Sequence, residues 1–148
     1  MNVTPYQQEQ AHTCAVACLR MVAEYFGVTR TEAQLLPLCD TTLDGTTPDG
    51  IARAARQLGL SATITYDEPT ILPESLSRQQ PLIVFSGIPV PPTPANLDLH
   101  AVVVTGLDHQ SVTFIDPLDG LEHARQRSDF FAHWENAFHV AILLGRSC

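Results

Sequence analysis

A cysteine near the start of the chain has the setting of a catalytic nucleophile. Cys14 follows Thr13, a favourable N-cap residue, and opens an apolar segment that predicts a helix over Cys14–Phe26, with Gly27 as its stop. A thiol at the first position of a helix lies beside unpaired backbone amides and the positive end of the helix dipole, which stabilise a thiolate. Cys14 is therefore a candidate nucleophile for acyl transfer, although a cysteine on an apolar helix is more often a small buried hydrophobe. We interpret Cys18, one turn later, in that second way.

A cysteine nucleophile needs a general base and a group that orients the base. Among the six histidines, His100 fits the base best, because it begins a β-branched strand directly after a proline-rich loop. A second strand is predicted over Ser111–Ile115. If the hairpin between them is centred on Asp108, His100 and Asp116 are directly opposed, with Cβ atoms roughly 5 Å apart. A carboxylate in that place accepts a hydrogen bond from one imidazole nitrogen and leaves the other nitrogen for a thiol.

Each of these residues also has a simpler interpretation. A histidine on a strand is more often structural than catalytic, and the pair Asp116-Pro117 is more often a strand terminator. The pairing depends on the hairpin as well, since a different turn would shift the register. An oxyanion hole needs a further donor, and Gln7, Gln8 and Gln10 are chemically equivalent candidates for it. The catalytic hypothesis therefore rests on the joint occurrence of these groups.

Length and charge limit the classes of protein to consider. A chain of 148 residues is long enough for one domain, residues 1–148, that buries roughly 70% of its unfolded surface. Eight basic residues, all arginine, stand against sixteen acidic ones, for a net charge of −8. An acidic surface without basic clusters argues against binding of nucleic acid or anionic membranes. The absence of lysine excludes Schiff-base and Ser-Lys chemistry.

The sequence carries no sign of export or of a membrane span. Its first ten residues lack the basic and apolar regions of a signal peptide, and no stretch approaches the ~20 apolar residues that a spanning helix needs. The cysteines, at positions 14, 18, 39 and 148, are too sparse and irregular for a disulfide framework or a zinc site. We expect a bacterial-type cytoplasmic protein with reduced thiols, no bound metal and no cofactor.

The hydrophobic pattern divides the chain into a helical first half and a second half rich in strands. A capping box at Thr31–Gln34 predicts a short helix to Leu38, and Thr47–Asp49 opens a further helix that stops at Gly59. Helices followed by hairpin-linked strands predict an α+β fold, with N-terminal helices packed on an antiparallel β-sheet. The predicted strands are Leu60–Tyr66, Pro81–Ser86, His100–Thr105, Ser111–Ile115 and His139–Leu144, with short helical segments at Pro73–Gln79 and after a cap at Ser128.

Three blocks of the sequence resemble the bacteriocin-processing, double-glycine leader peptidases, a family of papain-like cysteine peptidases. Gln8 is followed after five residues by Cys14-Ala-Val-Ala-Cys-Leu-Arg-Met-Val, which is similar to the family's Gln…Cys-Gly-x-Ala-Cys-Leu-x-Met block. The strand from His100 is similar to its histidine block, and Val112–Pro117 to its Asp-Pro block. Weaker similarity at Gly45–Gly59 and Phe130–Trp134 extends the resemblance over nearly the whole chain.

The resemblance implies roles for four residues. Cys14 is the nucleophile, His100 the general base and acid, and Asp116 the orienter. Gln8 is selected by the family spacing as the side-chain donor of the oxyanion hole, alongside the Cys14 backbone amide. One departure is Ala15, which stands where the family usually has glycine and would crowd the backbone of a substrate.

These features predict a cysteine peptidase that hydrolyses a peptide bond, after a small-residue motif such as Gly-Gly, through a thioester intermediate. The substrate is a peptide or protein segment, and we expect a stand-alone domain whose transporter or maturation partner is a separate protein. A deamidase or acyltransferase with the same Cys-His-Asp site is the nearest alternative. A non-catalytic peptide-binding module of the same fold is the rival from another class, and a structural or metal-binding protein comes third.

A prediction concerns the proline-rich loop over residues 87–98, which leads directly into His100. We expect this loop to form one wall of the substrate groove, whereas the alternative is a stiff surface connector. Replacing Pro91, Pro92 and Pro94 by alanine should raise the KM for peptide cleavage, because a restricted loop loses less entropy on docking. The same variant should keep its thiol reactivity. Unchanged cleavage kinetics would contradict the groove-wall hypothesis.

Overall fold

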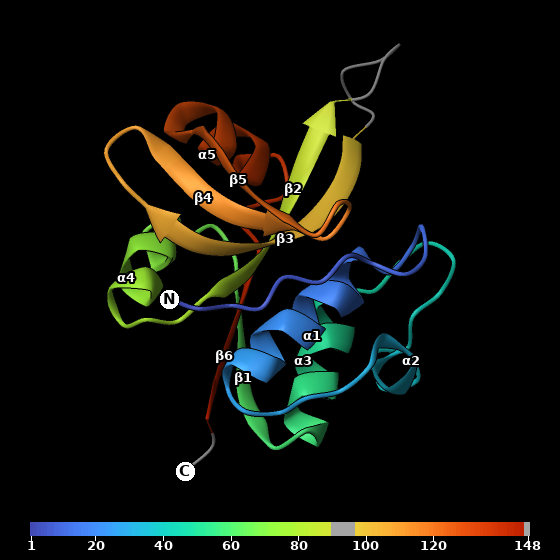
Figure 1. Ribbon diagram of the computed structural model, residues 1–148. Coiled ribbons are helices and arrows are strands. Elements are labelled where there is room, and N and C mark those ends of the chain that lie inside the picture. Colours follow the sequence, from blue (N-terminus) through green and yellow to red (C-terminus); the bar gives the residue numbers. More distant parts are fainter. Residues whose placement is uncertain (90–96, 147–148) are drawn as a thin grey trace.

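The apolar pattern of the first half folds into helices, and that of the second half folds into a sheet. In the computed structural model, which describes residues 1–89 and 97–146, helices α1 (Cys14–Tyr25), α2 (Glu32–Leu35) and α3 (Pro48–Gln57) come first. The strands form one antiparallel sheet in the spatial order β1-β6-β2-β3-β4-β5. Helices α1 and α3 cover one face of this sheet and α5 covers the other (Figure 1). The predicted α+β fold, with N-terminal helices packed on an antiparallel sheet, is confirmed.

All five predicted strands are present, but their ends differ from the prediction. The elements of the second half are β1 (Leu60–Thr65), α4 (Ile71–Ser77), β2 (Leu82–Pro89), β3 (Leu97–Leu107), β4 (Ser111–Asp116), β5 (Leu121–Gln126), α5 (Arg127–Glu135) and β6 (Ala141–Arg146). Strands β2 and β3 extend into the region predicted as a proline-rich loop. The remainder of that loop, residues 90–96, lies outside the described residues, so its role as a groove wall stays a prediction.

The sequence prediction is wrong in one further region, between Pro117 and the last helix. The prediction lacks β5, because this edge strand is mostly exposed and its residues show no apolar alternation. Ser128 is not the N-cap of α5 but lies in its first turn, since the helix begins at Arg127 after Gln126. The backbone N–H of Arg127 donates to the carbonyl of Gln110 at 2.8 Å, which fixes the start of the helix against the β3–β4 hairpin.

Two threonines at helix starts behave differently. Thr31 forms the predicted capping box, with Gln34 N–H donating to Thr31 Oγ1 and Thr31 N–H donating to Gln34 Oε1, although α2 ends at Leu35. Thr13 stands at the N-cap of α1, but its hydroxyl faces Gln10 instead. It accepts from the Gln10 N–H at 3.1 Å and donates to the Gln10 carbonyl at 3.0 Å. The Thr13 hydroxyl therefore accepts no hydrogen bond from the first backbone N–H groups of α1, which can donate to other partners.

The β3–β4 hairpin contains a bulge that sets the register of both strands. Near its tip Leu107 faces Val112, but beyond the extra residue Thr105 the register shifts, and Val103 faces Ile115. Continued to the strand end, this register places Asp116 opposite Val102 and two residues away from direct opposition with His100. The predicted direct opposition is therefore wrong by two residues. Both side chains still share one face, because side chains alternate with a period of two.

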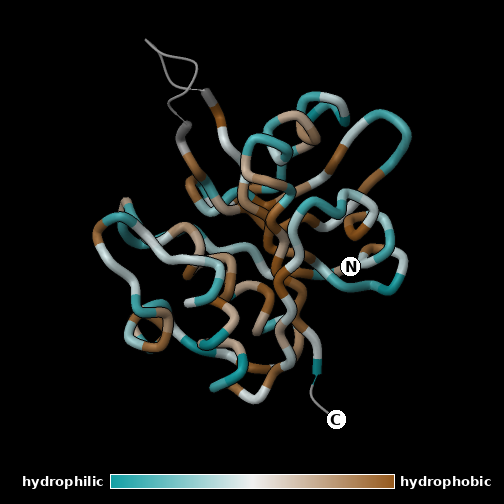
Figure 2. Tube along the Cα trace, turned by 180° about the vertical axis from the view of Figure 1, so that it is seen from behind, coloured by the Kyte–Doolittle hydropathy of each residue, from teal (hydrophilic) through white to brown (hydrophobic). Residues whose placement is uncertain are grey.

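Two hydrophobic cores lie on the two faces of the sheet. Figure 2 shows the most hydrophobic segments, in brown, gathered at the centre of the molecule. The first core packs α1 and α3 against Ile83, Val103 and Ile142, and it includes Cys18 and Cys39, whose side chains are almost completely buried. The second packs Trp134 and other residues of α5 against the opposite face. The first core therefore anchors the helix that begins at Cys14.

We predict that Cys18→Ala lowers stability and leaves the chemistry of Cys14 intact. The Cys18 side chain is completely buried. Removing its sulfur should lower the free energy of unfolding by about 1 kcal/mol through lost packing, which urea denaturation would measure. The rate of Cys14 alkylation should stay at the wild-type value. A stable Cys18→Ala variant that had lost its reactive thiol would show that the wrong cysteine was selected.

Candidate active site

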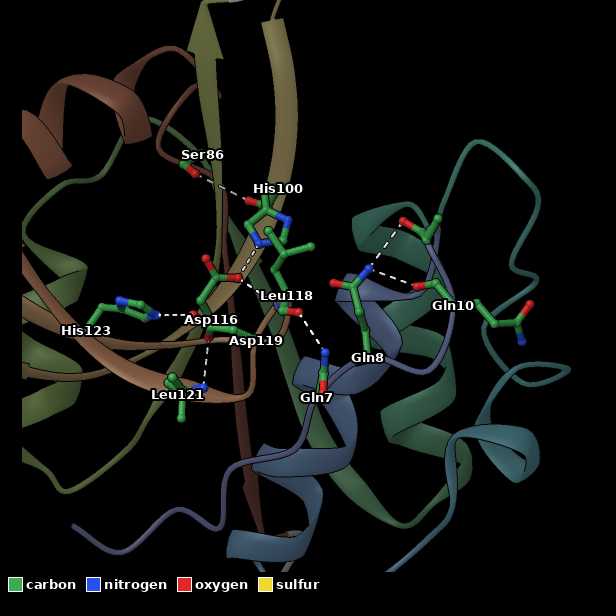
Figure 3. Close-up of polar contacts among 11 residues, drawn as sticks. Gln7, Gln8, Gln10, Ser86, His100, Asp116, Leu118, Asp119, Leu121 and His123 are labelled. Carbon is green, nitrogen blue, oxygen red and sulfur yellow. Dashed lines mark hydrogen bonds and ion pairs between the residues drawn. The ribbon is translucent and has the colours of Figure 1, made fainter.

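The polar centre of the site is a pair formed by a histidine on β3 and an aspartate at the end of β4. His100 Nε2 and Asp116 Oδ1 lie 2.5 Å apart, and both side chains are largely buried, with 19% and 21% exposed. Asp116 Oδ1 also accepts the backbone N–H of Leu118 at 2.9 Å (Figure 3). Burial acts to raise the pKa of Asp116, but the bonds from His100 and Leu118 outweigh it and lower that pKa. Asp116 is thus held as a carboxylate that orients the imidazole.

Cys14 is the third member of this group. Its side chain is half-buried at the first position of α1. Burial acts to raise the pKa of the thiol, but the hydrogen bond with His100 and the backbone N–H groups of Ala101 and Ala15 outweigh it and lower the pKa. Burial also acts to lower the pKa of His100, whereas its bonds to Asp116 and Cys14 raise it to about 10. Between these two pKa values the pair is a thiolate and an imidazolium.

The orientation of the imidazole follows from its partners. Because Nε2 faces Asp116, Nδ1 is the ring nitrogen left for the thiol. The backbone around His100 is also held, since Ser86 Oγ on the neighbouring strand β2 donates to the His100 carbonyl at 3.4 Å (Figure 3). The structure therefore brings together Cys14, His100 and Asp116, the three residues that the sequence analysis predicts as nucleophile, base and orienter.

Gln8 lies beside the start of α1, on the N-terminal segment that runs between the helices and the sheet (Figures 1 and 3). Its backbone N–H donates to the Pro117 carbonyl at 2.7 Å, which ties the segment to the residue after Asp116. Its side-chain Nε2 donates to the carbonyls of Gln10 and Ala11 at 2.8 and 3.2 Å. Within the described part of the chain, Gln8 Oε1 is buried without a hydrogen-bond partner. In this structure both donors of the amide are thus directed at the turn that precedes Cys14.

The other two glutamines are placed differently. Gln7 Nε2 donates to the Leu118 carbonyl at 3.2 Å, and the Cα and Cβ atoms of Gln7 pack closely against Gly120. Gln10 is exposed and contributes its backbone to the turn. Among the described residues, Gln8 is therefore the one of these three glutamines whose side-chain amide donates to the turn before Cys14.

A pocket of about 370 Å³ opens beside Cys14 and has a mainly apolar lining. It runs between the loop before α3 and the segment after α5. Phe138 and Val140 line the pocket from the segment after α5. In this segment the backbone is left-handed at Phe138 and His139, with φ values of +57° and +52°. Asn136 Nδ2 holds this segment by donating to the Gly87 carbonyl at 2.9 Å. The lining residues are Cys14, Ala15, Asp44, Gly45, Thr46, Pro48, Phe85, Leu99, Asn136, Ala137, Phe138 and Val140.

Sequence reasoning missed most of this pocket. The turn at Asp44–Thr46 carries only a weak family resemblance, and the segment after α5 carries none. The exposed Phe138, with 69% of its surface accessible, had no distinguishing pattern in the sequence. These segments meet Cys14 only through tertiary packing.

The described residues were compared with the requirements of a metal site and of a membrane-spanning helix. Among residues 1–89 and 97–146, no group of three or more histidine, cysteine, aspartate or glutamate side chains is placed to hold a metal ion. Within the same residues, no helix is both long enough and apolar enough to cross a membrane.

A cysteine at a helix start, with a histidine and a carboxylate on neighbouring strands, is the arrangement of papain-like cysteine peptidases. The fold agrees, because a cysteine protease of Carica candamarcensis, solved in complex with E-64, matches with a TM-score of 0.65 at 13% identity, over 99% of this chain and 94% of that one. The model of the peptidase C39 family matches residues 2–144, and the chain belongs to this family. The resemblance inferred from the sequence is therefore confirmed.

Relatives of the chain include peptidase domains of transporters. The transport/processing ATP-binding protein ComA of Streptococcus pneumoniae is 31% identical over 122 residues, which cover 82% of this chain and 16% of that protein. The solved peptidase domain of Streptococcus ComA, a bi-functional ABC transporter involved in quorum sensing, matches with a TM-score of 0.80 at 24% identity, over 99% of this chain and 100% of that one. The structure of a double glycine motif protease from an AMS/PCAT transporter, in complex with the leader peptide, matches with a TM-score of 0.76 at 22% identity. The match covers 99% of this chain and 93% of that one.

We predict that the pH dependence of Cys14 alkylation depends on His100. The alkylation rate with iodoacetamide follows the thiolate and should inflect below the ordinary thiol pKa of 9.0, because the pKa of Cys14 is lowered. In His100→Ala the inflection should move to higher pH. Burial raises the pKa of the thiol, and the hydrogen bond with His100, which opposes this rise most strongly, is then lost. Each unit by which the pKa then lies above pH 7 should lower the thiolate fraction, and with it the alkylation rate at pH 7, about tenfold.

The control for this measurement is His109→Ala, which removes an exposed histidine at the β3–β4 hairpin. This variant should keep the wild-type profile. Cys18 and Cys39 should contribute little, because burial raises the pKa of Cys18 and raises that of Cys39 to about 12. An unchanged inflection in His100→Ala would contradict the thiolate–imidazolium pair.

Proposed function

We propose that this protein is a cysteine peptidase that cleaves a peptide bond after a small-residue, Gly-Gly-like sequence. Cys14 is the nucleophile, His100 the general base and acid, and Asp116 the residue that orients the imidazole. The single observation that carries the proposal is the ordered chain of contacts from the Cys14 thiol through His100 to Asp116 at the mouth of an apolar pocket. The domain that performs this reaction spans residues 1–148.

The reaction follows from the charges of the pair. The Cys14 thiolate attacks the scissile carbonyl carbon, and the carbonyl electron pair moves onto oxygen to give a tetrahedral oxyanion. As the carbon–nitrogen bond breaks, imidazolium Nδ1 gives its proton to the leaving amine, which leaves a thioester and a neutral His100. The imidazole then takes a proton from water, and the hydroxide attacks the thioester. Cleavage of the carbon–sulfur bond releases the carboxylic acid product and restores the thiolate.

The oxyanion is stabilised by two donors in this proposal, the Cys14 backbone N–H and Gln8 Nε2. The Cys14 N–H is the first amide of α1, and such an amide has no acceptor within its own helix. Gln8 keeps its 2.8 Å bond to the Gln10 carbonyl and exchanges the longer, 3.2 Å bond to Ala11 for the oxyanion. One amide hydrogen thus fixes the side chain while the other stabilises the transition state.

The substrate is a peptide segment with a small residue before the scissile bond and an apolar side chain in the pocket. Support for the small residue comes from the relatives, one of which is named a double glycine motif protease and was solved with its leader peptide. Support for the apolar side chain comes from the lining of the pocket, which includes Phe85, Leu99 and Phe138. Substrate is delivered by a transporter or a maturation partner, in line with relatives that are peptidase domains of transporters.

We predict that Gln8→Ala lowers kcat for cleavage of a Gly-Gly peptide by about 10²- to 10³-fold, since one oxyanion donor is lost. Alkylation of Cys14 by iodoacetamide should be unchanged, because that reaction builds no charge on a carbonyl oxygen. Gln7→Ala is the matched control, since it removes a neighbouring amide that donates to Leu118. Cys14→Ala should abolish cleavage.

Mass spectrometry of the products separates the proposal from its alternatives. Two fragments that together contain one added water indicate hydrolysis of the peptide bond. A peptide of unchanged length that has gained one mass unit at a glutamine indicates a deamidase. Peptide binding by the wild-type protein without any product would indicate a binding module and overturn the proposed reaction.

A further inference from the structure

Glu32 is a buried carboxylate that takes no part in the reaction proposed above. It is the first residue of α2, and only 2% of its surface is exposed. Taking an ionised carboxylate out of water is unfavourable unless hydrogen bonds replace its hydration. Glu32 is the only aspartate or glutamate that is buried among the described residues, so its carboxylate requires hydrogen-bond partners.

The partners of Glu32 lie in the turn that precedes α1. The backbone N–H of Glu9 donates to both carboxylate oxygens, at 3.1 Å to Oε2 and 3.3 Å to Oε1. Burial raises the pKa of Glu32, and the bonds from the Glu9 N–H and the Thr13 hydroxyl limit this rise. Thr13 is itself completely buried and bonds to the backbone of Gln10. The carboxylate therefore bonds to the start of the turn at Glu9 and lies beside the Thr13 hydroxyl at its end.

The residues on either side of these contacts are the two oxyanion donors of the proposed reaction. Gln8 directly precedes Glu9, and Cys14 directly follows Thr13. The Gln8 side chain also takes its orientation from the carbonyls of Gln10 and Ala11 within the same turn. A movement of the turn would therefore displace the Gln8 amide relative to the Cys14 N–H.

We propose that Glu32 is a positioning residue of the oxyanion hole, whose carboxylate holds the turn from Gln8 to Cys14 in the shape from which Gln8 Nε2 and the Cys14 N–H converge on the oxyanion when it forms. This inference rests on the proposed function for its catalytic consequence. The hydrogen bonds that carry it do not depend on that function. Glu32 acts through Glu9 and Thr13 and does not touch the substrate.

The side chains of Glu9 and of Tyr6, three residues upstream, make separate contacts with α1. Arg20 of α1 lies 3.4 Å from the Glu9 carboxylate, and its guanidinium stacks 3.8 Å from the centre of the Tyr6 ring. The Tyr6 hydroxyl donates to Glu24 at 2.7 Å. These contacts keep the segment on α1 when Glu32 is changed, so a Glu32 variant tests the shape of the turn rather than the attachment of the segment.

The kinetic test compares Glu32→Ala, Glu32→Gln and the matched control Thr31→Ala with the wild type on a Gly-Gly peptide. Glu32→Ala should lower kcat about 10- to 100-fold, because small displacements of catalytic groups have effects of this size. KM should change by less than about threefold, since the loss occurs in the transition state. The decrease in kcat should be smaller in Glu32→Gln, because the amide oxygen can still accept a hydrogen bond from the Glu9 N–H. Thr31→Ala removes the cap of the same helix but leaves the carboxylate, and it should keep its kcat.

Two further measurements separate a failure of this inference from a failure of the proposed function. Iodoacetamide alkylation of Cys14 should be the same in all four proteins, because it needs no oxyanion hole. Amide hydrogen exchange at Glu9 should accelerate in Glu32→Ala and stay slow in Thr31→Ala, whether or not the peptide is cleaved. A wild-type protein that cleaves no peptide, with exchange as expected, would leave the turn contact supported and remove its catalytic consequence. Unchanged kcat in Glu32→Ala with an active wild type, or unchanged Glu9 exchange, would overturn the inference.

Discussion

The hydrogen bond between His100 and Asp116 is the interaction on which the arrangement of the site depends. It joins β3 to the end of β4, and the residues that follow Asp116 hold the N-terminal segment. Asp116 accepts the Leu118 N–H, and the Pro117 carbonyl accepts the Gln8 N–H. The strand end that orients the imidazole therefore also places the glutamine. Displacement of Asp116 would affect both parts of the site.

The electrostatic balance of the site explains why it lies at the boundary between helices and sheet. Burial opposes charge on Cys14, His100 and Asp116 alike, yet each is held in its charged form by its neighbours. In a completely buried site the desolvation cost would exceed these favourable interactions. This happens at Cys18, where burial raises the pKa of the thiol. Full exposure would weaken the interactions through solvent screening. Partial burial at the junction strengthens them without excluding the substrate.

Three of the predicted site residues lie together in the structure, although several elements around them have other bounds than predicted. Cys14 could be located because its N-cap, apolar helix and glycine stop are all local signals. His100 and Asp116 meet although the predicted register was two residues off, because a shift of two keeps the face of a side chain. The pocket could not be predicted, since Asp44 and Phe138 come together only in the folded chain. Glu32 was hidden because the capping box explained that segment without assigning its carboxylate a partner.

The bulge at Thr105 links the integrity of the site to that of the core. Without the extra residue, the pairing of Leu107 with Val112 would continue unbroken and set Val103 opposite Asp116. A charged side chain would then enter the packed interior in place of Ile115, which is 2% exposed, and Asp116 would leave the face of His100. Only an odd change in hairpin length has this effect, because an even change preserves both faces. The parity of the register in this hairpin therefore matters for folding as well as for the site, so a chain that loses the His100–Asp116 pair in this way loses stability with it.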